Sequence, residues 1–297
     1  NEKFNKSTTE IDNLIDCEIE ELNPWDPRIK DLFKITEPYN KCTKNEPLTY
    51  LDLNTNFLHI NQTVNKTYYN GNIIKCEYAV VLRKTVENDN YELDNYRIIT
   101  TEPMLIRNDF IKTRCYSQEK SKSQKLVYEY VHYSFNSKKN ISEYKNNENK
   151  MNVMILVLDA VSLSSMKRAL PNTLNYLKSF ENFFLFEKHH VTGENTFQNL
   201  IPLLTNMNPE DLLKRKKIEL QKKVKNETKI IKIDPPFDEF PFLWKNFSQN
   251  GYVTYFSEEW KDSTFYNLKY GFKEQPTDYY LRPFWLALYN SLSYAPT

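Results

Sequence analysis

The chain has 297 residues, of which 40% are hydrophobic and 14% are aromatic, enough for one large or two medium-sized packed domains. Its 40 basic and 39 acidic residues give a formal net charge of +1, so no broad basic face marks nucleic acid as the partner. It has only four glycines and no Gly-x-Gly-x-x-Gly or Walker motif, which excludes enzymes that hold nucleotides in glycine-rich loops.

The cysteines and the glycosylation motifs indicate where the protein is located. The cysteines are Cys17, Cys42, Cys76 and Cys115. Their spacing is not that of a zinc site, so we expect two disulfides, whose pairing stays open. The N-glycosylation sequons begin at Asn5, Asn61, Asn65, Asn140, Asn226 and Asn246. Together these features favour an extracellular protein or one in the lumen of the secretory pathway.

No apolar run in the chain approaches the length that a membrane span requires, so we expect none here. The chain begins at Asn1 without a methionine, and a signal peptide or an anchor could precede it.

The first half of the chain has the pattern of short antiparallel strands. Segments rich in Tyr, Val, Ile and Thr alternate with turns that contain Asn, Asp or Gly. The expected strands are Leu48–Leu53, Phe57–Ile60, Lys75–Arg83, Tyr96–Thr101 and Lys125–Tyr133. Asn70-Gly71 is a hairpin signal that places Thr63–Tyr69 opposite Ile73–Tyr78.

We therefore expect a small β-rich, disulfide-containing domain at residues 1–149, after a short helix near Asp26–Ile35. The segment Ser134–Lys150 is polar and nearly free of apolar residues, as is typical of an exposed connection. A second domain is expected at residues 150–297.

The second domain begins with the pattern of a parallel αβ unit. Val153–Leu158 is an apolar run too short for a helix, which predicts a strand buried on both faces. Helices are expected at Ser162–Ala169 and Pro171–Phe180, and a second strand at Phe183–Phe186. A crossover of this kind places the carboxyl ends of both strands at one edge of a parallel sheet.

Later segments extend this pattern. We expect a highly charged helix at Pro209–Glu227 and an amphipathic helix at Pro241–Asn250 that ends at Gly251. A third strand is expected at Tyr252–Ser257. The stretch from Phe265 to Tyr294 is so aromatic that we expect a partner to cover it.

Asp159 and Thr196 could carry chemistry on an anionic ester. A carboxylate at a strand end and a hydroxyl at a helix start fit metal-assisted attack, with Asp159 holding a divalent cation and Thr196 as the nucleophile. Asn195 and Asn199 would donate to the oxygens of the substrate. The alternative is that Asp159 and Thr196 only cap helices, because both residue types are favoured at that position. His189-His190 could lie at the edge of the same site.

Several motifs of this region occur together in one known family. They are Val-Met-Ile-Leu-Val-Leu-Asp159-Ala-Val-Ser162, Leu170-Pro-Asn-Thr-Leu-Asn-Tyr-Leu177, Gly193-Glu-Asn-Thr196-Phe-Gln-Asn-Leu-Ile-Pro-Leu-Leu-Thr205 and Gln275-Pro-Thr-Asp-Tyr-Tyr-Leu-Arg-Pro-Phe284. In these motifs the chain resembles the front part of the animal alkaline-phosphatase/sulfatase-like family catalogued as domain of unknown function two hundred and twenty-nine. The match covers Met151 to about Leu288 well and the cysteine-containing region loosely.

The resemblance implies a partial alkaline-phosphatase-like α/β core with a mostly parallel sheet. It also implies that Asp159 is a metal ligand, with zinc the favoured metal, and that Thr196 is the nucleophile. The chain departs from the family pattern at Ala160 and Leu163, where Ser and Arg are usual. The later Ser-Asp-His-Gly type motif and the further metal ligands do not occur before Thr297.

Two functions of different classes follow. The first is a metal-dependent hydrolase or transferase of phosphate or sulfate esters in the full-length form, with this chain incomplete or inactive by itself. The alternative is a non-catalytic extracellular binding or structural protein that retains the fold.

Overall fold

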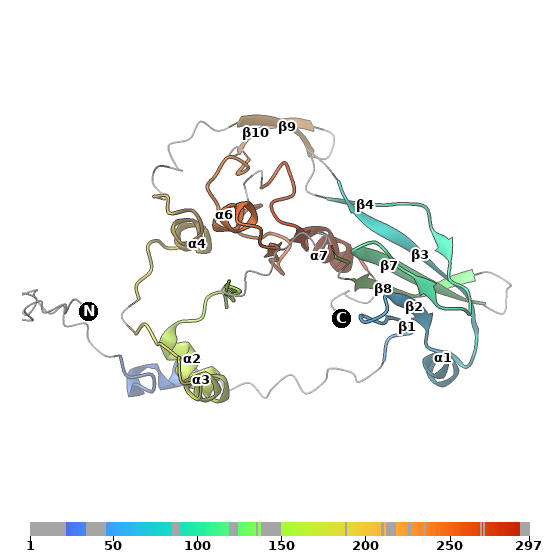
Figure 1. The fold of residues 1–297 in the computed structure, drawn as a ribbon, viewed down its shortest axis with the longest axis horizontal. Coiled ribbons are helices and arrows are strands. Elements are labelled where there is room, and N and C mark those ends of the chain that lie inside the picture. The colour runs from blue at the N-terminus through green and yellow to red at the C-terminus, as the bar shows by residue number, and fades with distance from the viewer. Residues whose placement is uncertain are drawn as a thin grey trace, which may run out of the picture. The chain divides into compact units, whose positions relative to one another are not determined.

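The computed structural model describes residues 22–33, 46–84, 90–118, 124–134, 136–137, 150–187, 189–208, 211, 218–224, 227–233, 236–267, 269 and 271–291. The chain forms two compact units (Figure 1). One contains residues 1–40 and 153–192, and the other contains residues 41–152 and 193–297. The predicted linker lies mostly outside the described residues, so the predicted division into 1–149 and 150–297 stays a prediction.

The first unit contains short helices at the positions that the sequence predicts. They are the 3-10 helix η1 (Pro27–Leu32), α2 (Leu163–Ala169) and α3 (Pro171–Lys178). The Ser162 hydroxyl accepts a hydrogen bond from the Ser165 N–H at 3.1 Å and caps α2. The Arg168 guanidinium donates to the Pro24 carbonyl at 2.8 Å and lies 3.9 Å from the centre of the Phe33 ring. These contacts join η1 to α2.

The predicted partial alkaline-phosphatase-like core with a mostly parallel sheet is wrong for the described residues. Neither Val153–Leu158 nor Phe183–Phe186 forms a strand, and the side chains from Val153 to Leu158 are 47–84% exposed. The described sheets are antiparallel, apart from one short parallel pair, β11 (Tyr255–Phe256) with β12 (Tyr279–Tyr280). An apolar run favours burial, but a strand forms only where a neighbour accepts its backbone hydrogen bonds.

A five-stranded antiparallel sheet is the main element of the second unit. Its strands are β3 (Ile73–Arg83), β4 (Tyr91–Leu93), β5 (Arg97–Ile98), β7 (Phe110–Gln118) and β8 (Gln124–Tyr133). The β-rich, disulfide-containing first half is therefore confirmed in its main strands. No strand is predicted at β7, because its charged residues interrupt the apolar pattern.

The cysteine prediction is confirmed for one pair. Cys76 and Cys115 lie directly opposite each other on β3 and β7 and form a disulfide. Both are almost fully buried. Cys17 and Cys42 lie outside the described residues.

The predicted hairpin around Asn70-Gly71 is replaced by a helix, α1 (Gln62–Tyr69). The Asn61 side chain caps its first turn, and Asn70 and Gly71 end it with positive φ values of 51° and 70°. The same two residues suit a hairpin turn and a helix C-terminus, because both require this backbone conformation. Next to α1, the strands β1 (Thr49–Leu51), β2 (Phe57–Ile60) and β6 (Met104–Leu105) form a small antiparallel sheet.

The last part of the second unit is built on aromatic side chains. Helix α4 (Thr196–Thr205) and helix α6 (Leu243–Gln249) occur where they are predicted. Ile201 of α4 and Trp244 of α6 are buried in one aromatic cluster with Phe237, Phe242 and other residues. Helix α7 (Arg282–Tyr289) lies against the five-stranded sheet, where Phe284 packs with residues of that sheet (Figure 1). The expected partner for this aromatic stretch stays a prediction.

Two further expectations differ from the structure. The charged segment predicted as a helix contains β9 (Ile218–Val224), which pairs with β10 (Glu227–Ile233) in an antiparallel hairpin. The predicted strand Tyr252–Ser257 is reduced to β11. Among the described residues, no helix is both long and apolar enough to cross a membrane.

Candidate functional site

Thr196 is the first residue of α4, a helix of 10 residues. The side-chain oxygen of Asn195 accepts a hydrogen bond from the Gln198 N–H at 3.1 Å and so caps the helix. Phe197 and Ile201 pack into the aromatic cluster and fix the helix to the rest of its unit. The predicted helix start is therefore confirmed, and it places a half-buried hydroxyl in the first turn.

The loop before α4 is closed by side-chain amides. Asn199 donates from Nδ2 to the Gly193 and Asn195 carbonyls, both at 2.8 Å. Gln198 accepts from the Glu194 N–H at 2.8 Å. Both Nδ2 protons of Asn199 are engaged within the loop, so a contact between Asn199 and a substrate anion would require one of these bonds to open. The predicted substrate-binding role of Asn195 and Asn199 stays a prediction.

A basic side chain not singled out in the sequence lies near the first turn of α4. The Lys269 ammonium is 4.5 Å from the centre of the Phe197 ring. A cation at this position adds to the partial positive charge of the helix N-terminus. The sequence gives no signal for Lys269, because it is distant from Thr196 along the chain.

Asp159 belongs to the other compact unit. It lies in an exposed turn, followed by Ala160 with a positive φ of 55°. A positive φ is energetically less favourable for a residue with a side chain than for glycine. Because Asp159 and Thr196 are in different units, the predicted approach of the carboxylate to the hydroxyl stays a prediction.

A metal site would need several His, Cys, Asp or Glu side chains close together. His189 and His190 are exposed and belong to the same unit as Asp159. In the part of the chain that the structure describes, no three His, Cys, Asp or Glu side chains lie together in a way that could hold a metal ion. The residues described here therefore do not fit a zinc site, and the divalent metal stays a prediction.

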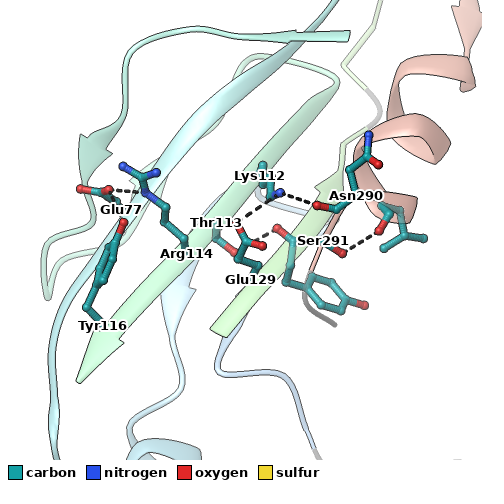
Figure 2. Close-up of polar contacts among 10 residues, drawn as sticks. Glu77, Lys112, Thr113, Arg114, Tyr116, Glu129, Asn290 and Ser291 are labelled. Atoms are coloured by element: carbon teal, nitrogen blue, oxygen red, sulfur yellow. Dashed lines mark hydrogen bonds and ion pairs between the residues drawn. The ribbon is translucent and has the colours of Figure 1, made fainter. Parts of the chain in front are cut away.

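Charged side chains that the sequence analysis did not single out lie on one face of the five-stranded sheet (Figure 2). Glu77 of β3 is buried and pairs with Arg114 of β7 and with Lys75, whose ammonium is 2.5 Å from it. Burial opposes the charged form of Glu77, but these hydrogen bonds outweigh it and hold the Glu77 pKa below its usual value. The Arg114 guanidinium lies 3.3 Å from the centre of the Tyr96 ring.

Lys112 lies two residues before Arg114 and therefore on the same face of β7. Its ammonium is 3.2 Å from the Glu129 carboxylate of β8 and donates to the Asn290 carbonyl at 3.3 Å (Figure 2). Asn290 is the C-cap of α7, where the helix dipole favours a cation. Lys112 thus fixes the end of α7 to the sheet. The alternation of charged residues with Ile111, Thr113 and Cys115 is the sequence signal for this face.

A neutral polar network lies on the opposite face of the same strands. His132 of β8 is buried, and its Nε2 lies 2.8 Å from the Thr49 hydroxyl. Thr49 also contacts the Thr113 hydroxyl at 2.9 Å and the Tyr128 hydroxyl at 3.2 Å. Burial lowers the pKa of His132 to about 3 and raises the pKa of Tyr128 to about 12. Both groups are therefore neutral at physiological pH, and the network is structural.

The carboxyl end of the β11–β12 pair carries a second group of buried polar residues. Arg282 follows β12, donates to the Trp260 carbonyl at 3.3 Å and lies 4.3 Å from the centre of the Tyr266 ring. Glu258 follows β11 and accepts the Thr264 N–H at 3.0 Å. Burial raises the Glu258 pKa, and the hydrogen bonds from Thr264 and Ser263, with a smaller contribution from the Arg282 charge, oppose that shift only in part. These contacts hold the loop between Glu258 and Thr264 in place.

Comparison with known proteins gives one result about the family. A family model described as "Protein of unknown function (DUF229)" matches residues 36–296. No curated protein and no solved structure matches the chain. The matched range includes the five-stranded sheet, the Asp159 turn and the start of α4.

Proposed function

The chain belongs to the DUF229 family of proteins of unknown function, and we propose that it acts on phosphate or sulfate esters through Thr196. The link to alkaline phosphatases and sulfatases is part of this proposal and concerns the chemistry only. The observation that carries it is the position of Thr196 in the first turn of α4, beside a cap that three amide side chains fix.

The first turn of a helix suits an anionic group. Its first N–H groups have no carbonyl partner within the helix, and the helix dipole adds partial positive charge. The Lys269 ammonium near Phe197 adds a full charge. A phosphate or sulfate group would therefore be attracted to the place where the Thr196 hydroxyl lies.

In the proposed reaction, the Thr196 oxygen attacks the phosphorus or sulfur atom of the ester. The bond from Oγ1 to that atom forms, the bond to the alcohol oxygen breaks, and the hydroxyl proton ends on the departing alcohol. Water then cleaves the enzyme ester in a hydrolase, and a second alcohol does so in a transferase. The partial positive charge of the helix N-terminus and the Lys269 ammonium stabilise the negative charge that develops on the transferred group.

Asp159 has a separate role in the proposal. It is the carboxylate that we propose as a ligand of a divalent metal. A divalent metal would supply Lewis acid chemistry at such a site, but the described residues hold no complete ligand set. We therefore assign no step of the reaction to a metal.

We also propose that the protein is a secreted or lumenal glycoprotein. The buried Cys76–Cys115 disulfide supports this, because disulfides persist in oxidising compartments.

The test is ester hydrolysis by the full-length protein, with aryl phosphate, phosphodiester and sulfate substrates and with Zn²⁺, Mn²⁺ or Ca²⁺ supplied in turn. Thr196→Val removes the hydroxyl but keeps the shape of the side chain, and we expect kcat/KM to fall by about 10³-fold or more. Thr196→Ser keeps the hydroxyl and should retain most of the activity. Lys269→Gln should mainly raise KM.

Equal activity of the wild type and Thr196→Val would refute the nucleophile assignment. If the wild type hydrolyses none of these esters under any of the metal conditions, the proposal fails and the non-catalytic alternative gains support. Circular dichroism of each variant separates loss of chemistry from loss of fold.

A further inference from the structure

A glycine in the loop before α4 lies directly against the first turn of that helix. The φ of Gly193 is outside the left-handed region, unlike that of Gly71 at 70°, so its backbone conformation also suits residues with a side chain. The space around it does not. A Cβ atom at Gly193 would lie 2.5 Å from Cβ and 2.8 Å from Cδ of Gln198, and it would overlap Oε1 of the same side chain.

The overlap with Cβ of Gln198 cannot be removed by rotating the Gln198 side chain. Rotation about χ1 moves Cδ and Oε1 away, but Cβ is fixed to the backbone of α4. Two carbon atoms that are not bonded pack at about 3.5–4.0 Å, so a side chain at Gly193 would push the loop and the first turn of the helix apart.

Hydrogen bonds cross between the loop and the first turn at this contact. Oε1 of Gln198 accepts the Glu194 N–H at 2.8 Å. The backbone N–H of Gln198 donates to the Asn195 side chain at 3.1 Å. Thr196 lies between these residues along the chain, so the distance between loop and helix that Gly193 permits also determines where Thr196 lies.

We propose that Gly193 is a positioning residue for the Thr196 hydroxyl. Because Gly193 has no side chain, the loop closes onto Gln198 and holds the start of α4 in one position. The inference rests on the proposed role of Thr196 as the nucleophile. It adds that this contact supports the chemical step, because a displacement of about 1 Å in a reacting group can lower the rate by about 10²-fold.

The test introduces Gly193→Ala into three backgrounds of the full-length protein: the natural Gln198, Gln198→Ala and Gln198→Gly. Gln198→Ala keeps the Cβ atom, so the overlap with the new side chain remains. Gln198→Gly removes that atom and makes room. Gly193→Ala should therefore have a large effect in the first two backgrounds and a small effect in the third. A general loss of helix stability would give the same effect in all three.

The first measurement is hydrogen exchange of the backbone amide at position 198, to which the Asn195 side chain is bonded. It requires no enzymatic activity. In the first two backgrounds Gly193→Ala should accelerate this exchange by about tenfold or more, because overpacking opens the cap. In the Gln198→Gly background the acceleration should be below about threefold.

The second measurement is ester hydrolysis under the conditions used for Thr196. In the first two backgrounds Gly193→Ala should lower kcat by about 10–100-fold and change KM by less than about threefold. KM is retained because the Lys269 charge near Phe197 is unchanged. In the Gln198→Gly background kcat should change by less than about threefold.

Faster exchange and lower kcat in the first two backgrounds, with little change in the third, support the proposal. A Gly193→Ala chain that folds only together with Gln198→Gly counts as the expected exchange result. Unchanged exchange in every background, or an equal increase in all three, overturns the proposal whether or not an ester is cleaved.

The kinetic result separates this inference from the proposed function. If the wild type cleaves an ester and Gly193→Ala exchanges faster but keeps its kcat, Thr196 does not depend on the contact and the positioning role is refuted. If the wild type cleaves no ester, the proposed function fails, and the exchange pattern still decides whether Gly193 holds the start of α4.

Discussion

Strand β3 and the segment Val153–Leu158 are similarly apolar but differ in structure. β3 pairs with β7 on one side and with β4 and β5 on the other, and its residues from Cys76 to Val81 are buried. Val153–Leu158 forms no strand, and its side chains are 47–84% exposed. Hydrophobicity alone therefore does not make a strand, because the backbone groups and both faces of the segment need partners.

The two regions also differ in the burial and pairing of their charged side chains. On the face of β7 with Lys112 and Arg114, each buried charge has a counter-charge on a neighbouring strand. Such pairing is necessary because an isolated buried charge is very unfavourable. The Asp159 turn, at the end of the exposed segment, lies in solvent. The β-sheet thus has the properties of a stable scaffold, and the candidate chemistry is assigned to less buried parts of the chain.

The largest effect is expected from a cavity in the scaffold. Leu58 is fully buried and packs in one cluster with Tyr78 and Val80 of β3. Leu58→Ala should lower the free energy of unfolding by about 2–5 kcal/mol. Urea unfolding followed by circular dichroism measures this change. A loss below about 1 kcal/mol would show that this cluster is not the core of the sheet.

The second largest loss of stability should come from removing the covalent link between β3 and β7. Cys76 and Cys115 are 39 residues apart, and closing a loop of this size lowers the entropy of the unfolded chain. Replacing both by alanine should reduce stability by about 2–4 kcal/mol.

The single variants serve as the control for the disulfide. Cys76→Ala and Cys115→Ala each break the same bond, so both should match the double variant within experimental error. Clearly different stabilities among the three would mean that the sulfur atoms contribute by packing more than by the link.

A smaller, pH-dependent effect is expected from His132. Its pKa is lowered from 6.5 to about 3 by burial, so below pH 6.5 the unfolded state binds a proton that the folded state does not. Stability should therefore fall as pH decreases from about 6.5 towards 3, by about 1.4 kcal/mol for each pH unit within that window. Above pH 6.5 this contribution is constant.

The control for this prediction is His132→Gln, which places an amide near Thr49 and cannot take up a proton in this range. Carboxylates also titrate there, so the measured quantity is the difference in slope between wild type and variant. Parallel unfolding curves at every pH would contradict a neutral, buried His132.

The sequence predicts local structure well where the signal is local. The Ser162 cap, the proline at the start of α3 and the start of α4 at Thr196 depend on neighbouring residues, and these helices are confirmed. The main strands of the first half follow from their β-branched and aromatic residues. The β7 strand is not predicted from the sequence. Its charged residues Lys112 and Arg114 are stabilised there by Glu129 and Glu77, which lie on neighbouring strands and are distant along the chain.

The candidate site is predictable to a smaller extent. The start of α4 and its Asn195 cap follow from the sequence, but the engagement of both Asn199 amide protons within the loop does not. Lys269 and the buried Arg282 come from distant parts of the chain, and a single sequence contains no signal that joins them to their neighbours. The parallel sheet is predicted from apolar runs whose pairing partners the sequence does not specify.

The smallest effect is expected in the exposed segment, and it tests the comparison most directly. Leu156 is 74% exposed and Leu58 is 0% exposed, so Leu156→Ala is the matched counterpart of Leu58→Ala. Removing the same atoms from a side chain already in water leaves no cavity, and the free energy of unfolding should change by no more than about 0.5 kcal/mol. The same urea titration measures it. If Leu156→Ala instead lowers the free energy of unfolding as much as Leu58→Ala does, the segment is buried in solution. Only a leucine that is packed against other side chains loses that many van der Waals contacts when it is replaced by alanine.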